Sequence, residues 1–225
     1  MAETRHVALL GHPVSHSLSP LMQNAAFAAA GLDWHYSGFD VEDPVEAVWA
    51  LVTLGFAGAN VTIPHKAAVV AACDEAEGDA VNTLVFRDDR VLGFNTDREI
   101  LAGIDARRAC VIGAGGAMQT LGPTLPDDTR VFSRRGDWPP DVAGADLVVN
   151  ATSERAAVLC ALSEGQTLVD LPYPETATAG AARDAGAAVV GGLDVLVAQG
   201  VASFELWTGV PAPVEVMRAA VGLAR

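Results

Sequence analysis

The only lysine of this sequence stands in a motif suited to acid–base chemistry. Lys66 closes the stretch G-A-N-V-T-I-P-H-K, which begins at Gly58, and the other 13 basic residues are all arginine. Arginine stays charged, whereas burial and neighbouring charges can tune a lysine amine to exchange protons. A single lysine retained among arginines therefore indicates a general acid or base. The competing explanation is the chance placement of one lysine.

A second stretch suits the binding of a dinucleotide. An apolar segment, residues 109–112, is followed by a glycine-rich loop made of Gly113, Ala114, Gly115, Gly116 and Ala117. A strand, a glycine turn and a helix let the backbone approach a pyrophosphate at the helix N-terminus. The sequence therefore predicts a dinucleotide site in this half of the chain.

The next predicted strand of that half ends in a cluster of positive charge. It covers residues 129–133 and leads from Ser133 into Arg134 and Arg135. An acidic residue at this place suits a free ribose 2′-hydroxyl, whereas two arginines suit a 2′-phosphate. We therefore expect NADP rather than NAD as the cofactor. The alternative is a solvated arginine pair at a strand end.

Composition limits the classes of partner. The 225 residues carry a formal charge of −14, which argues against nucleic acid and anionic membranes as partners. The apolar runs are too short to span a membrane, and residues 1–11 lack the layout of a secretory signal, so we expect a cytoplasmic protein. Three scattered cysteines argue against a disulfide framework and a closed zinc site, and no metal site is predicted.

The elements that must position these residues alternate between strand and helix. Strands are predicted over 6–11, 34–41, 56–62, 79–86 and 90–94, and helices are predicted to begin at Ser19, Asp43, Pro64 and Thr96 or Asp97. After a break at 106–108, strands are predicted over 109–112, 129–133, 146–150, 166–171 and 187–191, followed by helices over 193–207 and 213–224. This alternation predicts an α/β fold with mostly parallel sheets, in which polar residues at strand ends bind ligands.

With these pieces placed, the sequence resembles the shikimate dehydrogenase family, the shikimate and quinate dehydrogenases. Five segments in order carry the resemblance: G-H-P-V-S-H-S-L-S-P-L-M-Q-N from Gly11, N-V-T-I-P-H-K from Asn60, A-V-N-T from Ala80 with G-F-N-T-D from Gly93, G-A-G-G-A from Gly113, and Q-G-V-A-S-F-E-L-W-T-G from Gln199. N-A-T-S from Asn150 is a sixth, shorter segment.

The resemblance implies two α/β lobes. Residues 1–105 would form the substrate-binding catalytic domain, with C-terminal helices 197–225 packing back on it. Residues 106–196 would form a trimmed, Rossmann-like, NADP-binding domain. The protein would be a monomer or homodimer that acts on a small molecule.

The resemblance also assigns site residues. Lys66 and Asp97 would form the catalytic acid–base pair. The residues that would bind the substrate are Ser17, Ser19, Asn60, Thr62, Asn82 and Gln199. The residues that would bind the cofactor are Gly113 to Ala117, Ser133, Arg134, Arg135, Thr152 and Gly192. Taken alone, Ser17 and Ser19 could be turn and cap residues, and Asp97 could be a helix N-cap.

The chain departs from the family pattern mainly in the cofactor half. Arg98 stands where the family has glycine after N-T-D, and the helix after the glycine loop must fit between Gly116 and Asp127. The other departures are Met118, Val195 and the pair Glu154-Arg155.

From the matching segments we expect an NADP-dependent shikimate dehydrogenase. The alternatives are a quinate or aminoshikimate dehydrogenase, or a non-catalytic shikimate-binding protein with an impaired cofactor lobe.

Overall fold

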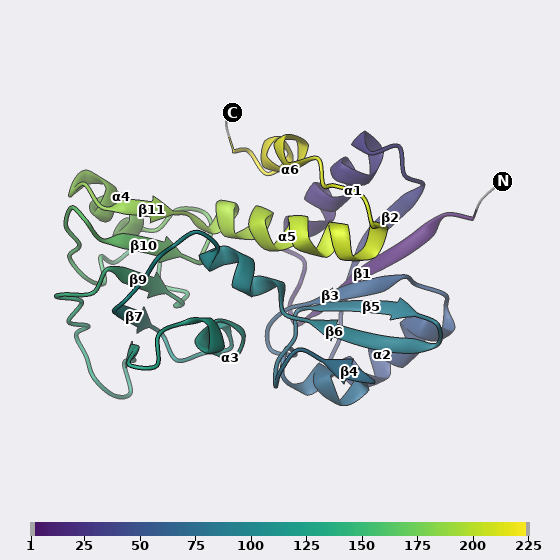
Figure 1. The fold of residues 1–225 in the computed structure, drawn as a ribbon, viewed down its shortest axis with the longest axis horizontal. Coiled ribbons are helices and arrows are strands. Elements are labelled where there is room, and N and C mark those ends of the chain that lie inside the picture. The colour runs from purple at the N-terminus through teal and green to yellow at the C-terminus, as the bar shows by residue number, and fades with distance from the viewer. Residues whose placement is uncertain (1–2, 224–225) are drawn as a thin grey trace. The chain divides into compact units, whose positions relative to one another are not determined.

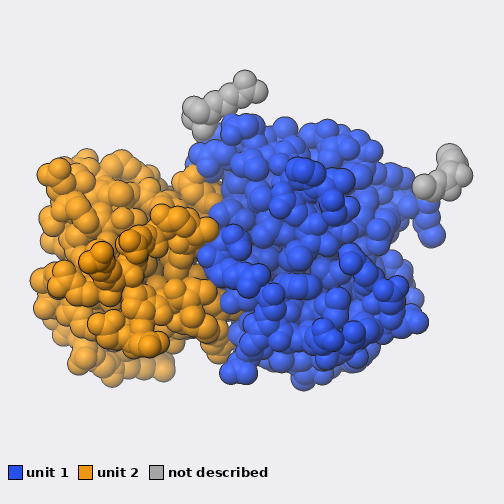
Figure 2. All heavy atoms as spheres, in the orientation of Figure 1, with its two compact units in different colours: residues 1–100, 196–225 blue, residues 101–195 orange. Residues whose placement is uncertain are grey.

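The chain forms two compact units in a computed structural model that describes residues 3–223. Unit 1 comprises residues 1–100 and 196–225, and unit 2 comprises residues 101–195 (Figure 2). Each unit has its own sheet, so the predicted α/β class with parallel strands is confirmed. Within the described residues, no helix has the length and apolar character needed to cross a membrane.

Unit 1 is built on a six-stranded mixed sheet. Its strands are β1 (Arg5–Gly11), β2 (Trp34–Asp40), β3 (Gly58–Val61), β4 (Glu75–Ala76), β5 (Thr83–Arg87) and β6 (Arg90–Phe94), in the order β2-β1-β3-β5-β6-β4. β1 pairs in parallel with β2 and β3, whereas β5 is antiparallel to both β3 and β6. The turn between β5 and β6 places Asp88 and Asp89 at positive φ, as a tight two-residue hairpin turn requires.

Helices cover both faces of this sheet (Figure 1). The α-helices of unit 1 are α1 (Ser19–Ala29), α2 (Pro44–Thr53), α6 (Val214–Ala220) and the part of α5 (Gly192–Thr208) from residue 196 onward. Asp43 caps α2 as predicted, because its carboxylate accepts from the backbone N–H groups of Val45 and Glu46 at 2.9 and 3.1 Å.

The packing of α5 on the sheet is tight enough to require glycine at one strand position. A Cβ atom on Gly58 would lie 2.3 Å from the Leu84 carbonyl oxygen and 2.5 Å from Nε1 of Trp207. Trp207 uses that nitrogen to donate to the same carbonyl at 2.9 Å. The stacked rings of Phe27 and Phe204, 5.3 Å apart, join α1 to α5. The C-terminal helices are therefore part of the unit 1 core.

Two predicted helices of unit 1 form only short 3-10 turns. The segment after Pro64 gives η1 (Ala68–Ala72), and the segment after Asn95 gives η2 (Thr96–Leu101). The Lys66 carbonyl accepts from Val81 N at 2.9 Å instead of from a residue further along a helix. These tertiary bonds override the local helix signal, and Lys66 lies in a turn rather than in a helix.

The predicted cap of α1 is also wrong in detail. Leu18 occupies the N-cap position without a side-chain hydrogen bond, and Ser19 is already helical. Ser19 is buried and does not cap its own helix. Burial raises the pKa of the Tyr36 phenol above its ordinary value, and the Ser19 side chain opposes the rise.

Unit 2 is built on a five-stranded parallel sheet. Its strands are β7 (Ala109–Ile112), β8 (Arg130–Phe132), β9 (Leu147–Asn150), β10 (Thr167–Asp170) and β11 (Ala188–Val190), in the order β11-β10-β9-β7-β8. Its complete helices are α3 (Ala117–Leu121), the 3-10 turn η3 (Gly122–Thr124) and α4 (Ala177–Asp184). The expected shortness of the helix after the glycine loop is therefore confirmed, since α3 has five residues.

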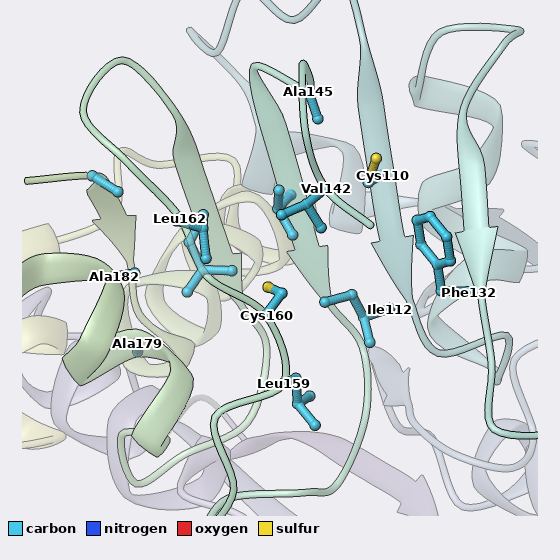
Figure 3. Packing of buried hydrophobic residues seen from close by; sticks show 13 residues of the cluster. Cys110, Ile112, Phe132, Val142, Ala145, Leu159, Cys160, Leu162, Ala179 and Ala182 are labelled. Carbon is cyan, nitrogen blue, oxygen red and sulfur yellow. The ribbon is translucent and has the colours of Figure 1, made fainter. Parts of the chain in front are cut away.

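Irregular segments cover much of this second sheet. In the described chain, the connections 133–146 and 151–166 contain no helix. Figure 3 shows side chains of these connections beside the strands, among them Val142, Leu159, Cys160 and Leu162. They pack with Cys110 and Ile112 of β7 in one buried cluster. Apolar loop residues thus bury a sheet face that crossover helices cover in most parallel sheets.

Candidate active site

Lys66 and Asp97 are in direct contact within unit 1. The ammonium group of Lys66 donates a hydrogen bond to Oδ2 of Asp97, and the two groups form an ion pair. The side chains keep 13% and 9% of their surface exposed, respectively. At such low exposure, water screens the attraction less than at an open surface. The pair therefore presents an ammonium donor held in place by a carboxylate.

Asn82 binds the second oxygen of the same carboxylate. Its Nδ2 donates to Oδ1 of Asp97 at 2.6 Å. Its Oδ1 accepts from the backbone N–H of Thr96 at 2.8 Å and from the Thr96 hydroxyl at 3.1 Å. Because a backbone N–H can only donate, the amide oxygen must face Thr96 and the NH₂ group must face Asp97. The orientation of Asn82 is therefore fixed.

A buried network of hydrogen-bonded side chains lies next to Asn82. Nδ2 of Asn60 lies 3.1 Å from the Asn82 carbonyl oxygen. The same nitrogen lies 2.9 Å from the hydroxyl oxygens of both Thr83 and Ser203. Oδ1 of Asn60 accepts from the Tyr36 phenol at 2.8 Å. These side chains are almost wholly buried. A fully bonded network of this kind specifies one arrangement, since an unpaired buried polar group is costly.

This network contains one predicted site residue and one that was not predicted. The side-chain amide of Asn60, a predicted substrate residue, is bonded to protein partners on both its oxygen and its nitrogen. Ser203 was missed because its partners Asn60 and Thr83 are more than a hundred residues away in sequence. The available signal was its spacing, since Ser203 follows Gln199 by one helical turn and donates to the Gln199 carbonyl at 2.9 Å.

Two of the remaining predicted substrate residues follow strands of the same sheet, and the third lies on α5. Ser17 is in the loop after β1, where its hydroxyl accepts from Ser19 N at 3.2 Å. Thr62 follows β3, and its methyl group packs so closely on Gly11 that a Cβ there would lie 2.4 Å away. Gln199 lies on α5, where its Nε2 donates to the Leu196 carbonyl of the same helix at 2.8 Å.

Unit 2 has a cavity of about 410 Å³ at the carboxyl ends of β7, β8 and β9. Its lining residues are Gly113, Ser133, Arg134, Trp138, Thr152, Ser153, Glu154 and Leu159. Gly113 has a φ of 109°, and a Cβ there would lie 2.9 Å from the Ala151 carbonyl oxygen. Only glycine fits this turn. The cavity therefore combines a glycine turn, hydroxyl groups, one arginine and one glutamate.

Four of the predicted cofactor residues, Gly113, Ser133, Arg134 and Thr152, line this cavity. Gly192 is not among these lining residues; it is buried, and a Cβ there would lie 2.2 Å from the Pro172 carbonyl oxygen. Arg135 has an exposed side chain at the strand end. The other predicted members, Ala114, Gly115, Gly116 and Ala117, form the turn after Gly113 and the start of α3. In the described residues, no group of three or more potential ligands could hold a metal ion.

Known proteins resemble the chain along nearly its whole length. Residues 9–84 match the model of the shikimate dehydrogenase substrate binding domain, and residues 192–221 match that of the shikimate 5′-dehydrogenase C-terminal domain. A shikimate dehydrogenase (NADP(+)) of Moorella thermoacetica is 40% identical, over 96% of this chain and 92% of the relative. One of Methanopyrus kandleri is 38% identical, over 98% and 96%.

Solved structures give the same picture. A crystal structure of a shikimate dehydrogenase in complex with NADP⁺ superposes with a TM-score of 0.86 at 30% identity, covering 97% of this chain and 94% of that one. A shikimate 5-dehydrogenase of Thermus thermophilus in complex with NADP(H) and shikimate has a TM-score of 0.84 at 31% identity, covering 96% and 98%.

The chain is nevertheless shorter than its relatives. The alignment with the Moorella protein runs over 273 positions, whereas this chain has 225 residues, so at least 48 positions face a gap in this chain.

Proposed function

This chain belongs to the shikimate dehydrogenase family, and we propose that it catalyses the reversible, NADP-dependent reduction of 3-dehydroshikimate to shikimate. The observation that carries the proposal is the constellation of Lys66, Asp97 and Asn82 in unit 1. Relatives at up to 40% identity bear this activity in their names and align along nearly their whole length.

Lys66 acts as the proton donor and acceptor in this proposal. When a ring ketone is reduced, negative charge develops on its oxygen, and an ammonium group can hydrogen-bond that oxygen and release a proton to it. Asp97 keeps the ammonium in place, and Asn82 keeps the carboxylate in place. In the reverse direction Lys66 accepts the proton of the substrate hydroxyl. Since the two groups are in contact, the acid–base role is assigned to the pair.

Hydroxyl and amide groups of unit 1 select the substrate. We assign Ser17 and Ser19 to the carboxylate, and Thr62, Asn82 and Gln199 to the ring hydroxyls. A site that bonds each hydroxyl rejects analogues that lack one, because its own polar groups are then left unpaired. Asn60 serves the same site by fixing the Asn82 backbone, which it reaches at 3.1 Å.

Unit 2 supplies the cofactor site. The residues that would hold NADP are Gly113 and Thr152 near the phosphates and Ser133 and Arg134 near the ribose 2′-phosphate. Arg134 suits a phosphate because its guanidinium offers several donors in one plane. The chemistry supplied by a bound nicotinamide cofactor is hydride transfer to the ring ketone.

Further features of the proposal concern the setting of the protein. We propose that it acts in the cytoplasm as a monomer or homodimer. All three cysteines, Cys73, Cys110 and Cys160, are free, which suits a reducing compartment.

A turnover panel tests the proposal. Shikimate and quinate are each mixed with NADP and with NAD, and the appearance of reduced nicotinamide is followed. We expect the highest kcat/KM with shikimate and NADP. A higher value with quinate would reassign the substrate, and no turnover in any combination would reject the dehydrogenase.

The second candidate function is non-catalytic binding of shikimate. The shortness of α3 and the loops of unit 2 favour it, because they reduce the scaffold around the glycine turn. Calorimetric titration separates the two functions. The binding protein predicts a heat signal with shikimate and none with NADP or NAD, whereas the enzyme predicts binding of both kinds of ligand.

A further inference from the structure

The cofactor cavity of unit 2 contains a carboxylate beside its arginine. Oε2 of Glu154 accepts a hydrogen bond from Arg134 at 3.2 Å, and both residues line the cavity. The sequence alone suggested two arginines available to a phosphate. In the structure Arg134, which lines the cavity, already has a negative partner.

Glu154 is held in this position by its own loop. Its Oε1 accepts from the backbone N–H groups of Ala156 and Ala157 at 2.9 and 3.2 Å. These two bonds, together with Arg134, keep the pKa of the Glu154 carboxyl below its ordinary value. The side chain is therefore an anion at neutral pH and is tied to the backbone on the side away from Arg134.

The loop is in turn fixed to the buried end of the sheet. The Glu154 backbone N–H donates to the Thr152 hydroxyl at 3.2 Å, and that hydroxyl donates to Oδ1 of Asn150 at 2.8 Å. Asn150 is fully buried and donates to Asp170 at 2.7 Å. A series of bonds thus runs from the sheet interior to the Glu154 backbone and fixes the loop segment that carries the carboxylate.

Arg134 is restrained on another side by an aromatic ring. Its guanidinium carbon lies 5.5 Å from the ring centroid of Trp138, which also lines the cavity. Cation–π attraction at this distance favours the observed position of the guanidinium. The arginine therefore has a carboxylate and a ring as resident partners.

We propose that Glu154 sets the cofactor preference of this chain by weakening the selection of a ribose 2′-phosphate at Arg134. A 2′-phosphate that binds Arg134 must share the guanidinium with Glu154 and comes close to a second negative charge. NAD has a hydroxyl at this place and meets no such repulsion. The ratio of NADP affinity to NAD affinity is therefore smaller than it would be if the arginines had no acidic neighbour. This inference rests on the proposed function, because it assigns a residue to the same cofactor site.

The test compares two nucleotides that differ only in the 2′-phosphate. Adenosine 2′,5′-bisphosphate and adenosine 5′-monophosphate are titrated into the full chain by calorimetry, and the ratio of their Kd values measures the contribution of the 2′-phosphate. In the Glu154→Gln variant the amide oxygen can still accept from Ala156 and Ala157, so the loop is preserved while the charge is removed.

We expect Glu154→Gln to tighten the bisphosphate about three- to fivefold and to leave the monophosphate unchanged, as for one exposed charge interaction. The matched control is Glu164→Gln, which removes the same charge from an exposed position elsewhere in unit 2. The control should not change the ratio. In an Arg134→Ala background, Glu154→Gln should still tighten the bisphosphate, but by less, because only the direct repulsion between Glu154 and the phosphate is then removed.

An unchanged ratio in Glu154→Gln, or an equal change in Glu164→Gln, would overturn the inference. Either result leaves the proposed function standing if the variants still oxidise shikimate with NADP. Failure of the proposed function gives a different pattern, in which the wild-type chain binds neither nucleotide and shows no turnover.

Discussion

The two units differ in how their proposed sites are held. In unit 1 the site residues Asn82 and Asp97 are buried and bonded through Asn60, Thr83 and Ser203 to strands and a helix. In unit 2 the cavity residues Arg134 and Trp138 are exposed and belong to an irregular connection.

This difference agrees with what the two proposed sites need from their scaffolds. Proton transfer depends on exact placement of a donor, because a small displacement lowers the rate steeply. Cofactor binding by a parallel sheet uses mainly the carboxyl ends of its strands and the turn after the first one. Unit 2 presents those strand ends with a five-residue α3 and irregular connections. In unit 1, helices lie on both faces of the sheet (Figure 1).

The largest effect is expected from a change in the buried acid of unit 1. Asp97→Asn removes the charge that holds the Lys66 ammonium, and we expect kcat to fall about a hundredfold to ten-thousandfold, the range of general acid–base catalysis. NADP affinity, a property of unit 2, should be unchanged. Steady-state kinetics and a cofactor titration measure the two quantities, and a parallel loss of NADP affinity would contradict the separation of roles.

A core substitution in unit 2 should have the opposite pattern. Leu162→Ala leaves a cavity beside the sheet and is expected to lower the free energy of unfolding by about 2–4 kcal/mol. Thermal denaturation with and without each ligand measures this loss. NADP affinity should fall more than shikimate affinity, because the substitution lies in unit 2. The control Val158→Ala lies in the same connection but is exposed, so its stability should match the wild type. Equal losses in the two variants would show that this loop is not a core element.

The polar network of unit 1 predicts a smaller loss of stability. Ser203→Ala leaves buried groups of Asn60 and Thr83 with one partner fewer, which costs about 1–2 kcal/mol. The control Thr53→Ala removes a hydroxyl that also donates to the carbonyl four residues earlier, but at the surface. We expect urea denaturation to show a loss in Ser203→Ala only, together with a reduced kcat. A loss of similar size in Thr53→Ala would mean that burial is not the cause.

The smallest effect concerns pH and a loop of unit 2. Asp146 accepts from the backbone N–H groups of Arg108 and Arg107, and these bonds lower the pKa of its carboxyl. A carboxyl whose pKa is lowered in the folded state stabilises the fold at any pH above its ordinary pKa. This stability is lost as the pH falls through the pKa of the folded state. Asp146→Asn should therefore cost about 0.5–1 kcal/mol at pH 7 and nothing in strong acid. Equal stability at pH 7 would refute this.

Local motifs predicted several strand ends and a pair of residues that are in contact in the structure. The run ending at Lys66, the N-T-D segment and the glycine loop were located from neighbouring residues, and Lys66 contacts Asp97 in the structure. The helix expected after Pro64 failed because a backbone bond from Val81 takes the Lys66 carbonyl. Such long-range bonds leave no signal in a single sequence.

The same limit applies to side chains that meet across the fold. Ser203 and Asn60 are separated by 143 residues, and no spacing rule links them. Glu154 was noted only as a departure from the family pattern, whereas its contact with Arg134 depends on the fold of two loops. The close contact of Gly192 with Pro172 likewise depends on how α5 starts against β10.

The most direct test of the central claim is the rate of shikimate oxidation by Lys66→Ala, measured with saturating NADP alongside the affinity of the variant for shikimate. The account predicts that turnover falls at least about a hundredfold, as for loss of a general acid–base group, while shikimate binds almost as tightly as to the wild type. A variant that retains most of the wild-type rate would contradict the assignment of Lys66 as the catalytic acid and base.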